Sequence, residues 1–139
     1  MKKIIELLLK EAEKGVKKGE IPVAALIVKD GEIIARAHNQ RVKKGITMGH
    51  AEILVINKAN KILKDWRLTG CDMYVTLKPC NMCDAVIKES RIDNVFYLVD
   101  PLEHKKKYNK TKEIKMGDEF SNYSQKYGEM FSDFFSDKR

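Results

Sequence analysis

The chain has 139 residues, 43% of them hydrophobic, which is enough to bury the core of one domain, so we expect a single domain over residues 1–139. No apolar run reaches the roughly 18 residues that a membrane-spanning helix needs, and the charged N-terminus lacks a signal-peptide core, so we expect a cytoplasmic protein with no membrane partner. The formal net charge of +7 favours a polyanionic partner such as nucleic acid, although a lysine-rich composition explains it equally well.

The first part of the chain predicts a helix followed by a β-hairpin. Apolar residues at helical spacing predict a helix over 2–14. Two short apolar runs follow at 23–28 and 33–37, and Asp30-Gly31 between them is a strong signal for a two-residue hairpin turn.

The middle of the chain predicts two helices that alternate with strands. A basic, glycine-containing loop at 41–49 leads to a helix over 51–63. We expect this helix to bury one apolar stripe, formed by Ile53, Ile56, Ala59, Ile62 and Leu63. A strand over 72–77, a helix over about 81–89 and a strand over 94–99 follow.

The order of these elements predicts an α/β sandwich whose central sheet is mixed, because a hairpin is combined with strands joined by helical crossovers. Residues 101–125 are rich in lysine and show a poor strand pattern. They suit a solvated charged loop and a phosphate-contacting patch equally well. Residues 122–138 suit a last amphipathic helix, whose aromatic residues we expect to serve mainly in packing.

Two short motifs contain the residues with the most specific chemistry: His50-Ala51-Glu52 and Pro79-Cys80-Asn81-Met82-Cys83. Two thiolates and one imidazole are good zinc ligands, and three protein ligands leave the fourth tetrahedral position open to water. Zinc lowers the pKa of such a water from about 15.7 to about 7, and a nearby carboxylate can then move its proton. The motifs therefore predict one zinc ion per chain held by His50, Cys80 and Cys83, with Glu52 as the catalytic proton shuttle.

Two other interpretations of these motifs remain open. A closed structural zinc site needs a fourth ligand, and His38, His104 and Cys71 are available, although no second C-x-x-C pair completes the usual set. A redox pair formed by the two motif cysteines leaves the histidine and the glutamate without a role. The odd count of three cysteines argues against a disulfide framework and for a reducing compartment.

Around these motifs the chain resembles the cytidine/deoxycytidylate deaminase superfamily of zinc enzymes, and within it the bacterial tRNA adenosine deaminases above all. The resemblance covers most of the chain except roughly residues 101–125. The matching stretches are 19–25, Asn39, 50–53, 66–68, 74–77, 79–83, 90–92 and, near the end, 132–135.

The resemblance implies a three-layer α/β/α sandwich around a mixed five-stranded sheet, with zinc at the ends of two helices. It implies a homodimer in which the partner completes part of each site. The implied reaction is hydrolytic deamination of adenosine to inosine at the wobble position of a tRNA anticodon loop, with zinc-activated water attacking C6 and Glu52 moving the protons.

The resemblance also implies substrate contacts. Asn39 matches an asparagine that hydrogen-bonds the flipped base, and its alternative role is that of a turn residue after a strand. Asp100 matches an aspartate near the RNA, or equally ends a strand before Pro101. The remaining implied contacts come from the apolar side chains of Ile21 and Val23, the backbone N–H groups of Ala51 and Cys80, and Phe134 in the tail.

Four departures from the family pattern concern the substrate side: Ala24 in place of glycine, the run 46–49, Lys78 in place of glutamate, and the stretch after Asp100. None of them touches the zinc ligands. The alternative function is therefore deamination of a free base, nucleoside or nucleotide, such as guanine or a cytosine compound. A zinc-stabilised RNA-binding module without catalysis is a third interpretation, against which the carboxylate of Glu52 counts.

Overall fold

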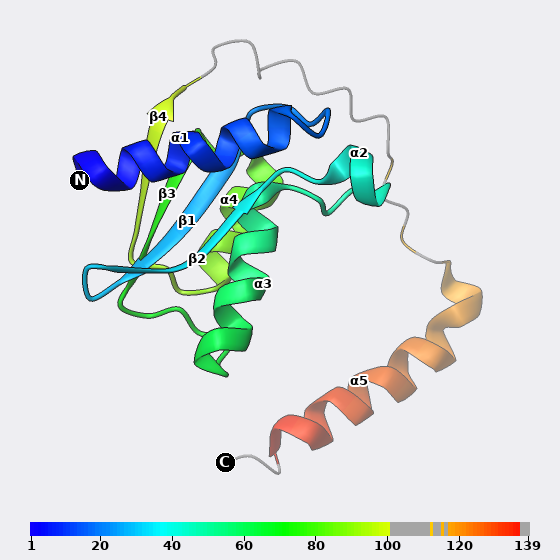
Figure 1. The fold of residues 1–139 in the computed structure, drawn as a ribbon. Coiled ribbons are helices and arrows are strands. Elements are labelled where there is room, and N and C mark those ends of the chain that lie inside the picture. Colours follow the sequence, from blue (N-terminus) through cyan, green and yellow to red (C-terminus); the bar gives the residue numbers. More distant parts are fainter. Residues whose placement is uncertain (101–111, 113–114, 116, 137–139) are drawn as a thin grey trace. The chain divides into compact units, whose positions relative to one another are not determined.

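A computed structural model describes residues 1–100, 112, 115 and 117–136 (Figure 1). The chain divides into two compact units, Met1–Lys106 and Lys107–Arg139, and each unit is described by itself below. The single domain expected over residues 1–139 stays a prediction.

The first unit contains a mixed sheet, as the sequence predicts. Its strands are β1 (Ala24–Lys29), β2 (Glu32–His38), β3 (Cys71–Leu77) and β4 (Asn94–Val99). They are arranged in the order β2-β1-β3-β4. The pairs β1–β2 and β1–β3 are antiparallel and β3–β4 is parallel. The β3–β4 connection is a helical crossover, because parallel neighbours cannot be joined by a tight turn.

The number of strands corrects the expectation from the sequence, since the described residues form four strands and not five. The fifth strand was expected within 101–125, where lysines replace the β-branched and aromatic residues that favour strands. Residues 101–111, 113–114 and 116 lie outside the described residues, and 117–125 hold helical turns.

Helices cover both faces of the sheet, so the elements of the first unit lie in three layers (Figure 1). Alternate residues of a strand point to opposite faces. Accordingly, Ala24 and Leu26 of β1 pack with α1 (Lys2–Val16), whereas Ala25 and Ile27 pack with α3 (Ala51–Leu63) and α4 (Asn81–Glu89). Because β1 is buried on both faces, its sequence is a continuous apolar run.

The helix bounds agree closely with the sequence pattern, and the buried stripe of α3 differs at two positions. The last turn of α3 places only Leu63 against the core, so Ile62 is 57% exposed. Val55, which the expected stripe omitted, is fully buried. One short helix, α2 (Arg41–Lys44), lies in the segment that was expected to be a loop.

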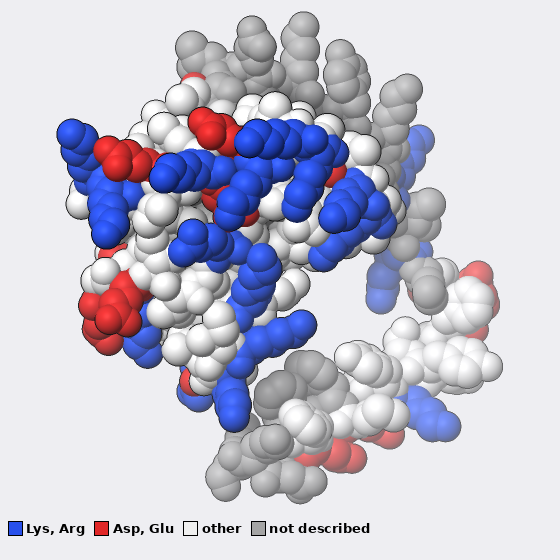
Figure 2. All heavy atoms as spheres, viewed as in Figure 1, with Lys and Arg blue, Asp and Glu red and all other residues white. Residues whose placement is uncertain are grey.

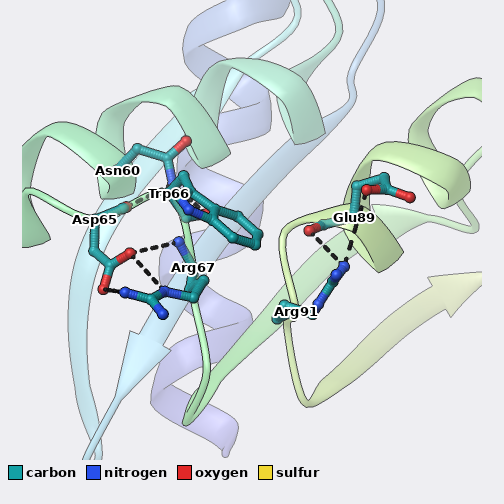
Figure 3. A network of polar contacts seen from close by, with 6 residues as sticks. All are labelled: Asn60, Asp65, Trp66, Arg67, Glu89 and Arg91. Atoms are coloured by element: carbon teal, nitrogen blue, oxygen red, sulfur yellow. Dashed lines mark hydrogen bonds and ion pairs between the residues drawn. The ribbon is translucent and has the colours of Figure 1, made fainter. Parts of the chain in front are cut away.

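A network after α3 fixes the turn that leads from this helix back to the sheet (Figure 3). The Asn60 side-chain amide donates to the carbonyl oxygens of Asp65 and Trp66, both at 3.1 Å. The guanidinium groups of Arg67 and Arg91 lie 5.6 and 5.4 Å from the centre of the Trp66 ring. Since Arg91 lies two residues after the end of α4, these contacts link the C-terminal ends of α3 and α4.

The second unit contains a 3-10 turn, η2 (Asp118–Phe120), and the helix α5 (Ser121–Ser136), close to the range predicted from the sequence. Several of its large apolar side chains are exposed, namely those of Phe120, Tyr123, Tyr127, Met130 and Phe134. Neither α5 nor any other helix in the described part of the chain is long and apolar enough to span a membrane.

Replacing Leu26 with alanine should lower the free energy of unfolding by about 2–5 kcal/mol, because its buried side chain fills the layer between α1 and the sheet. Chemical denaturation measures this loss. Leu9→Ala on the exposed side of α1 is the matched control and should cost far less. Equal losses for the two variants would contradict the assignment of α1 to this face.

Candidate metal centre

The three predicted metal ligands come together at the beginning of two helices. His50 is the N-cap residue of α3 and Cys80 is the N-cap residue of α4, both with extended backbone angles. Cys83 lies three residues after Cys80, one turn into α4, so its side chain is on the same face of the helix. Both helices direct their positive dipole ends at this point, which favours thiolates.

The distances within the cluster suit one tetrahedral metal ion. The nearest ligand atoms of His50, Cys80 and Cys83 all lie within 4.8 Å of one another. The Nδ1 atom of His50 is 3.3 Å from the sulfur of Cys83 and 3.9 Å from the sulfur of Cys80. In a tetrahedral zinc site with Zn–N of about 2.0–2.1 Å and Zn–S of about 2.3 Å, such atoms are about 3.5 Å apart.

The electrostatics of the cluster also suit a bound cation. Burial lowers the pKa of the His50 imidazole. The negative charge of Glu52 raises this pKa, and the positive charge of Arg41 lowers it further. The pKa is lowered overall, which favours the neutral imidazole that binds metals. Burial raises the pKa of Cys83 far above its usual range, and the nearby Glu52 and Cys80 add to the increase. A divalent cation reverses this effect, because it stabilises both thiolates directly.

Glu52 is the second residue of α3 and is only 4% exposed. Its Oε1 atom is buried and has no hydrogen-bond partner among the described residues. Buried carboxylate oxygens normally accept a hydrogen bond, so this atom is available to a water molecule or a substrate group beside the metal ligands. The geometry therefore suits the proton-shuttle role, which stays a prediction.

The described residues do not supply a fourth protein ligand. His38 is engaged elsewhere, because its Nδ1 lies 2.6 Å from Oε2 of Glu11. Cys71 is at the first residue of β3, the opposite end of that strand from the motif cysteines. His104 lies outside the described residues. Within the described part of the chain, the only group of metal-binding side chains is thus a three-ligand one.

Asn39 lies between the hairpin and the metal cluster. Its Oδ1 accepts the backbone N–H of Ala51 at 3.0 Å. A backbone N–H can only donate, so the side-chain oxygen must face it and the Asn39 NH₂ group remains the donor for a substrate. The Ala51 N–H, which was expected to face the substrate, thus has an acceptor within the protein.

The other predicted substrate residues lie in different surroundings. Ile21 is exposed and lines a cavity of about 380 Å³. Val23 is buried in the core between the sheet and α3. Asp100 is exposed and forms an ion pair of 3.6 Å with Lys78. Phe134 belongs to the second unit. Their contacts with a substrate stay predictions.

Glu20 has no role predicted from the sequence. This residue is 6% exposed, and its carboxylate accepts the backbone N–H groups of Val42 and Lys43 at 3.2 and 2.8 Å. The partners are more than twenty residues away in the sequence, so no local pattern could have revealed the contact.

Comparison with known families agrees with this geometry. Residues 1–99 match the family model of the cytidine and deoxycytidylate deaminase zinc-binding region. The chain belongs to this deaminase family. Zinc is therefore the metal that the family binds in this region, and His50, Cys80 and Cys83 are positioned to bind one such ion.

Several curated relatives of this chain are named tRNA-specific adenosine deaminase. The protein of that name from Bacillus subtilis (strain 168) is 49% identical over 89 residues, which cover 64% of this chain and 55% of the relative. The one from Aquifex aeolicus (strain VF5) is 44% identical over 93 residues, covering 67% of this chain and 62% of the relative. The chain spans about half the length of the first curated relatives it matches.

Two solved structures resemble this chain. One, from a study of A-to-I editing by tRNA:A34 deaminases at the wobble position, has a TM-score of 0.65 and 43% identity, covering 67% of this chain and 72% of that chain. The other, guanine deaminase from Bacillus subtilis, has a TM-score of 0.74 and 26% identity, covering 91% of this chain and 93% of that chain.

Removing one metal ligand should release zinc. We expect wild-type protein to retain one zinc ion per chain after extensive dialysis and Cys83→Ala to retain almost none, as measured by elemental analysis. Cys71→Ala is the matched control, because Cys71 is equally buried but lies outside the cluster, and it should keep its zinc. Undiminished, tightly bound zinc in Cys83→Ala would show that the ligand set is different.

Proposed function

We propose that this protein deaminates adenosine to inosine at the wobble position of a tRNA anticodon loop. The observation that supports the chemistry best is the His50–Cys80–Cys83 cluster with the buried, unpartnered carboxylate oxygen of Glu52 beside it. The observation that supports the substrate is the 43–49% identity to proteins named tRNA-specific adenosine deaminases. The relatives are longer than the part matched, so their activity and substrate are carried over as proposals.

The reaction requires water to add at C6 of adenine and the C6–amino bond to break, so that ammonia leaves and the oxygen remains as the 6-oxo group of inosine. Zinc, when bound, supplies a water whose pKa is lowered to about 7. Glu52 accepts a proton at its unpartnered Oε1 and delivers protons to the ring nitrogen and to the leaving amino group. Its position in the first turn of α3 lets it reach the reacting atoms without binding the metal.

Asn39 orients the base in this proposal. Because its Oδ1 is held by Ala51, the side chain presents its two N–H donors, which suit the acceptor nitrogens of a purine. Ile21 supplies an apolar wall for the base, and Asp100 and Phe134 contact the RNA. The target adenosine must be unpaired or flipped out of its stack, which an anticodon loop provides at little cost.

The partners and location belong to the same proposal. A net charge of +7 supports binding to a polyanion such as tRNA. The resemblance to tRNA adenosine deaminases supports a homodimer, and a tRNA substrate supports a cytoplasmic location. We also propose that residues 1–139 work as one domain.

A second candidate function is deamination of free guanine. The specific observation in its favour is the guanine deaminase structure, whose match covers 91% of this chain and therefore extends beyond residue 100. The sequence identity favours the tRNA substrate, since it is 26% for the guanine enzyme and 43% for the solved structure from the tRNA:A34 deaminase study. The two candidates differ in whether nucleotides around the target base contribute binding energy.

A substrate panel tests the choice. We expect an anticodon stem-loop with a wobble adenosine to yield inosine, whereas free adenosine, guanine and cytidine are not detectably deaminated. Contacts remote from C6 contribute binding energy that orients the base, and free bases lack them. Mass spectrometry of the digested RNA measures inosine, and a stem-loop with the adenosine moved one position is the control. Robust turnover of guanine with the stem-loop untouched would support the second candidate instead.

Glu52→Gln should keep the fold and the zinc but reduce turnover by about 10²- to 10⁴-fold, which is the usual contribution of a general acid–base group. The substitution keeps the side-chain shape and removes the proton acceptor. Glu13→Gln makes the same change on the exposed side of α1 and should leave turnover unchanged. A Glu52→Gln protein with half the wild-type activity would show that another group moves the proton.

A further inference from the structure

The loop between Asn39 and His50 combines features of a nucleic-acid contact. Between Glu32 and Glu52 the sequence contains no acidic residue. Arg41, Lys43 and Lys44 of α2 are all exposed. The loop also exposes the apolar side chains of Val42, Ile46 and Met48. Figure 2 shows Lys and Arg side chains gathered along α1 and α2 on the face that it draws. Cations suit phosphates and exposed apolar groups suit bases, so the composition favours single-stranded nucleic acid.

The ends of this loop are fixed beside the metal cluster. Gln40 donates its backbone N–H to the carbonyl oxygen of Gly49 at 2.7 Å, which closes the loop. A Cβ atom at Gly49 would lie 2.6 Å from the backbone nitrogen of Arg41. Only glycine therefore allows the beginning and the end of the loop to approach each other this closely. His50 follows at once, so the loop leads directly into the metal cluster.

Glu20 holds the middle of the loop. Its Oε1 accepts the N–H of Val42 and its Oε2 accepts the N–H of Lys43, and the carboxylate is almost fully buried. The backbone of Glu20 is itself fixed, because its N–H donates to the carbonyl oxygen of Gly15 at the end of α1. The negative charge of Glu20 thus faces backbone N–H donors of the loop. Through Glu20, α2 is connected to the end of α1.

A cavity lies between the loop and the segment that contains Glu20. Its volume of about 380 Å³ is within the range of small-ligand sites. Its walls are formed by Gly19, Glu20, Ile21, Asn39, Arg41, Val42, Gly45, Ile46 and Thr47. Asn39 also bonds the first turn of α3, so the cavity adjoins the place where the target base would be oriented. The planar guanidinium of Arg41 can bind a phosphate through two hydrogen bonds.

We propose that this cavity is the subsite for an RNA nucleotide that flanks the target adenosine, that Arg41 binds its phosphate, and that Glu20 is the positioning residue that holds Arg41 in place. The inference rests on the proposed function and deepens it. It assigns part of the preference for RNA over a free nucleoside to the loop 40–49, which contains the run 46–49, one of the four departures from the family pattern. Thr47 and Ile46 line the same wall and limit the size of the flanking nucleotide.

Binding of a fluorescent anticodon stem-loop, measured by anisotropy at several salt concentrations, tests the role of Arg41. We expect Arg41→Glu to weaken binding about tenfold or more, because a charge-assisted hydrogen bond is lost. The slope of log affinity against log salt should fall by about 0.7 for one lost single-strand phosphate contact. Zinc content should not change, and the milder Arg41→Ala should act in the same direction. Lys61→Glu, at the far end of α3 from His50, should bind like wild type.

A double-mutant cycle tests whether Glu20 acts through Arg41. Glu20→Gln keeps the side-chain size but leaves one of the two loop N–H groups without its carboxylate acceptor. It should raise KM for the stem-loop with little change in kcat. In the Arg41→Glu background it should have almost no further effect on RNA affinity. Additive losses would mean that Glu20 supports the fold only and would overturn its positioning role.

The possible failures are distinguishable. If wild type deaminates the stem-loop and both Arg41 variants match it in affinity and salt slope, the subsite is overturned and the proposed function stands. If wild type neither binds nor deaminates the stem-loop, the proposed function and the subsite are both overturned. Weaker binding and a smaller slope in the Arg41 variants, with unchanged zinc and an unchanged Lys61→Glu control, support the subsite.

Discussion

The convergence of two helix N-termini is the constraint on which the site depends. His50 and Cys80 are each an N-cap residue with extended backbone angles, so their side chains meet where the positive ends of both dipoles point. The opposite ends of these helices are linked through the Trp66 turn, and both helices pack on one face of the sheet. The fold therefore fixes the distance between the imidazole and the thiols, and the ligands are preorganised before a metal binds.

The substrate side of the site is coupled to the metal side through one buried hydrogen bond. Asn39 ends the hairpin, and its bond to Ala51 fixes both the start of α3 and the orientation of its own amide. The loop 40–49 begins and ends next to Asn39, and the Glu20 carboxylate accepts hydrogen bonds from two backbone N–H groups in its middle. Under the proposed subsite, a change in this loop alters which nucleotides are accepted without moving the metal ligands.

The zinc ligands could be predicted from the sequence because each of the two motifs has a short, specific spacing, although His50 and Cys80 are 30 residues apart. The proton-shuttle role of Glu52 stays a prediction. Two of the ligands are three residues apart on one helix, and the glutamate follows the histidine by two. Two sets of hydrogen bonds could not be predicted: those that Glu20 accepts from the backbone of α2, and the one that Asn39 accepts from Ala51. Their partners are 12 to 23 residues away in the sequence. Ile62 has the right spacing for the core, yet its side chain is exposed among the described residues, which periodicity alone does not reveal. The fifth strand was expected from the resemblance, and the lysine-rich sequence there has little strand propensity.

We expect the metal to be held by three protein ligands, with a fourth position that opens towards Glu52. Cobalt(II)-substituted protein tests it directly, because the visible absorption of cobalt(II) reports its ligands and their geometry. We expect the spectrum of a tetrahedral site with two thiolates, and a clear spectral change when a small anion such as azide or cyanide replaces the exchangeable ligand. A tetrahedral spectrum that no anion changes would reveal a closed site with four protein ligands and would contradict the account.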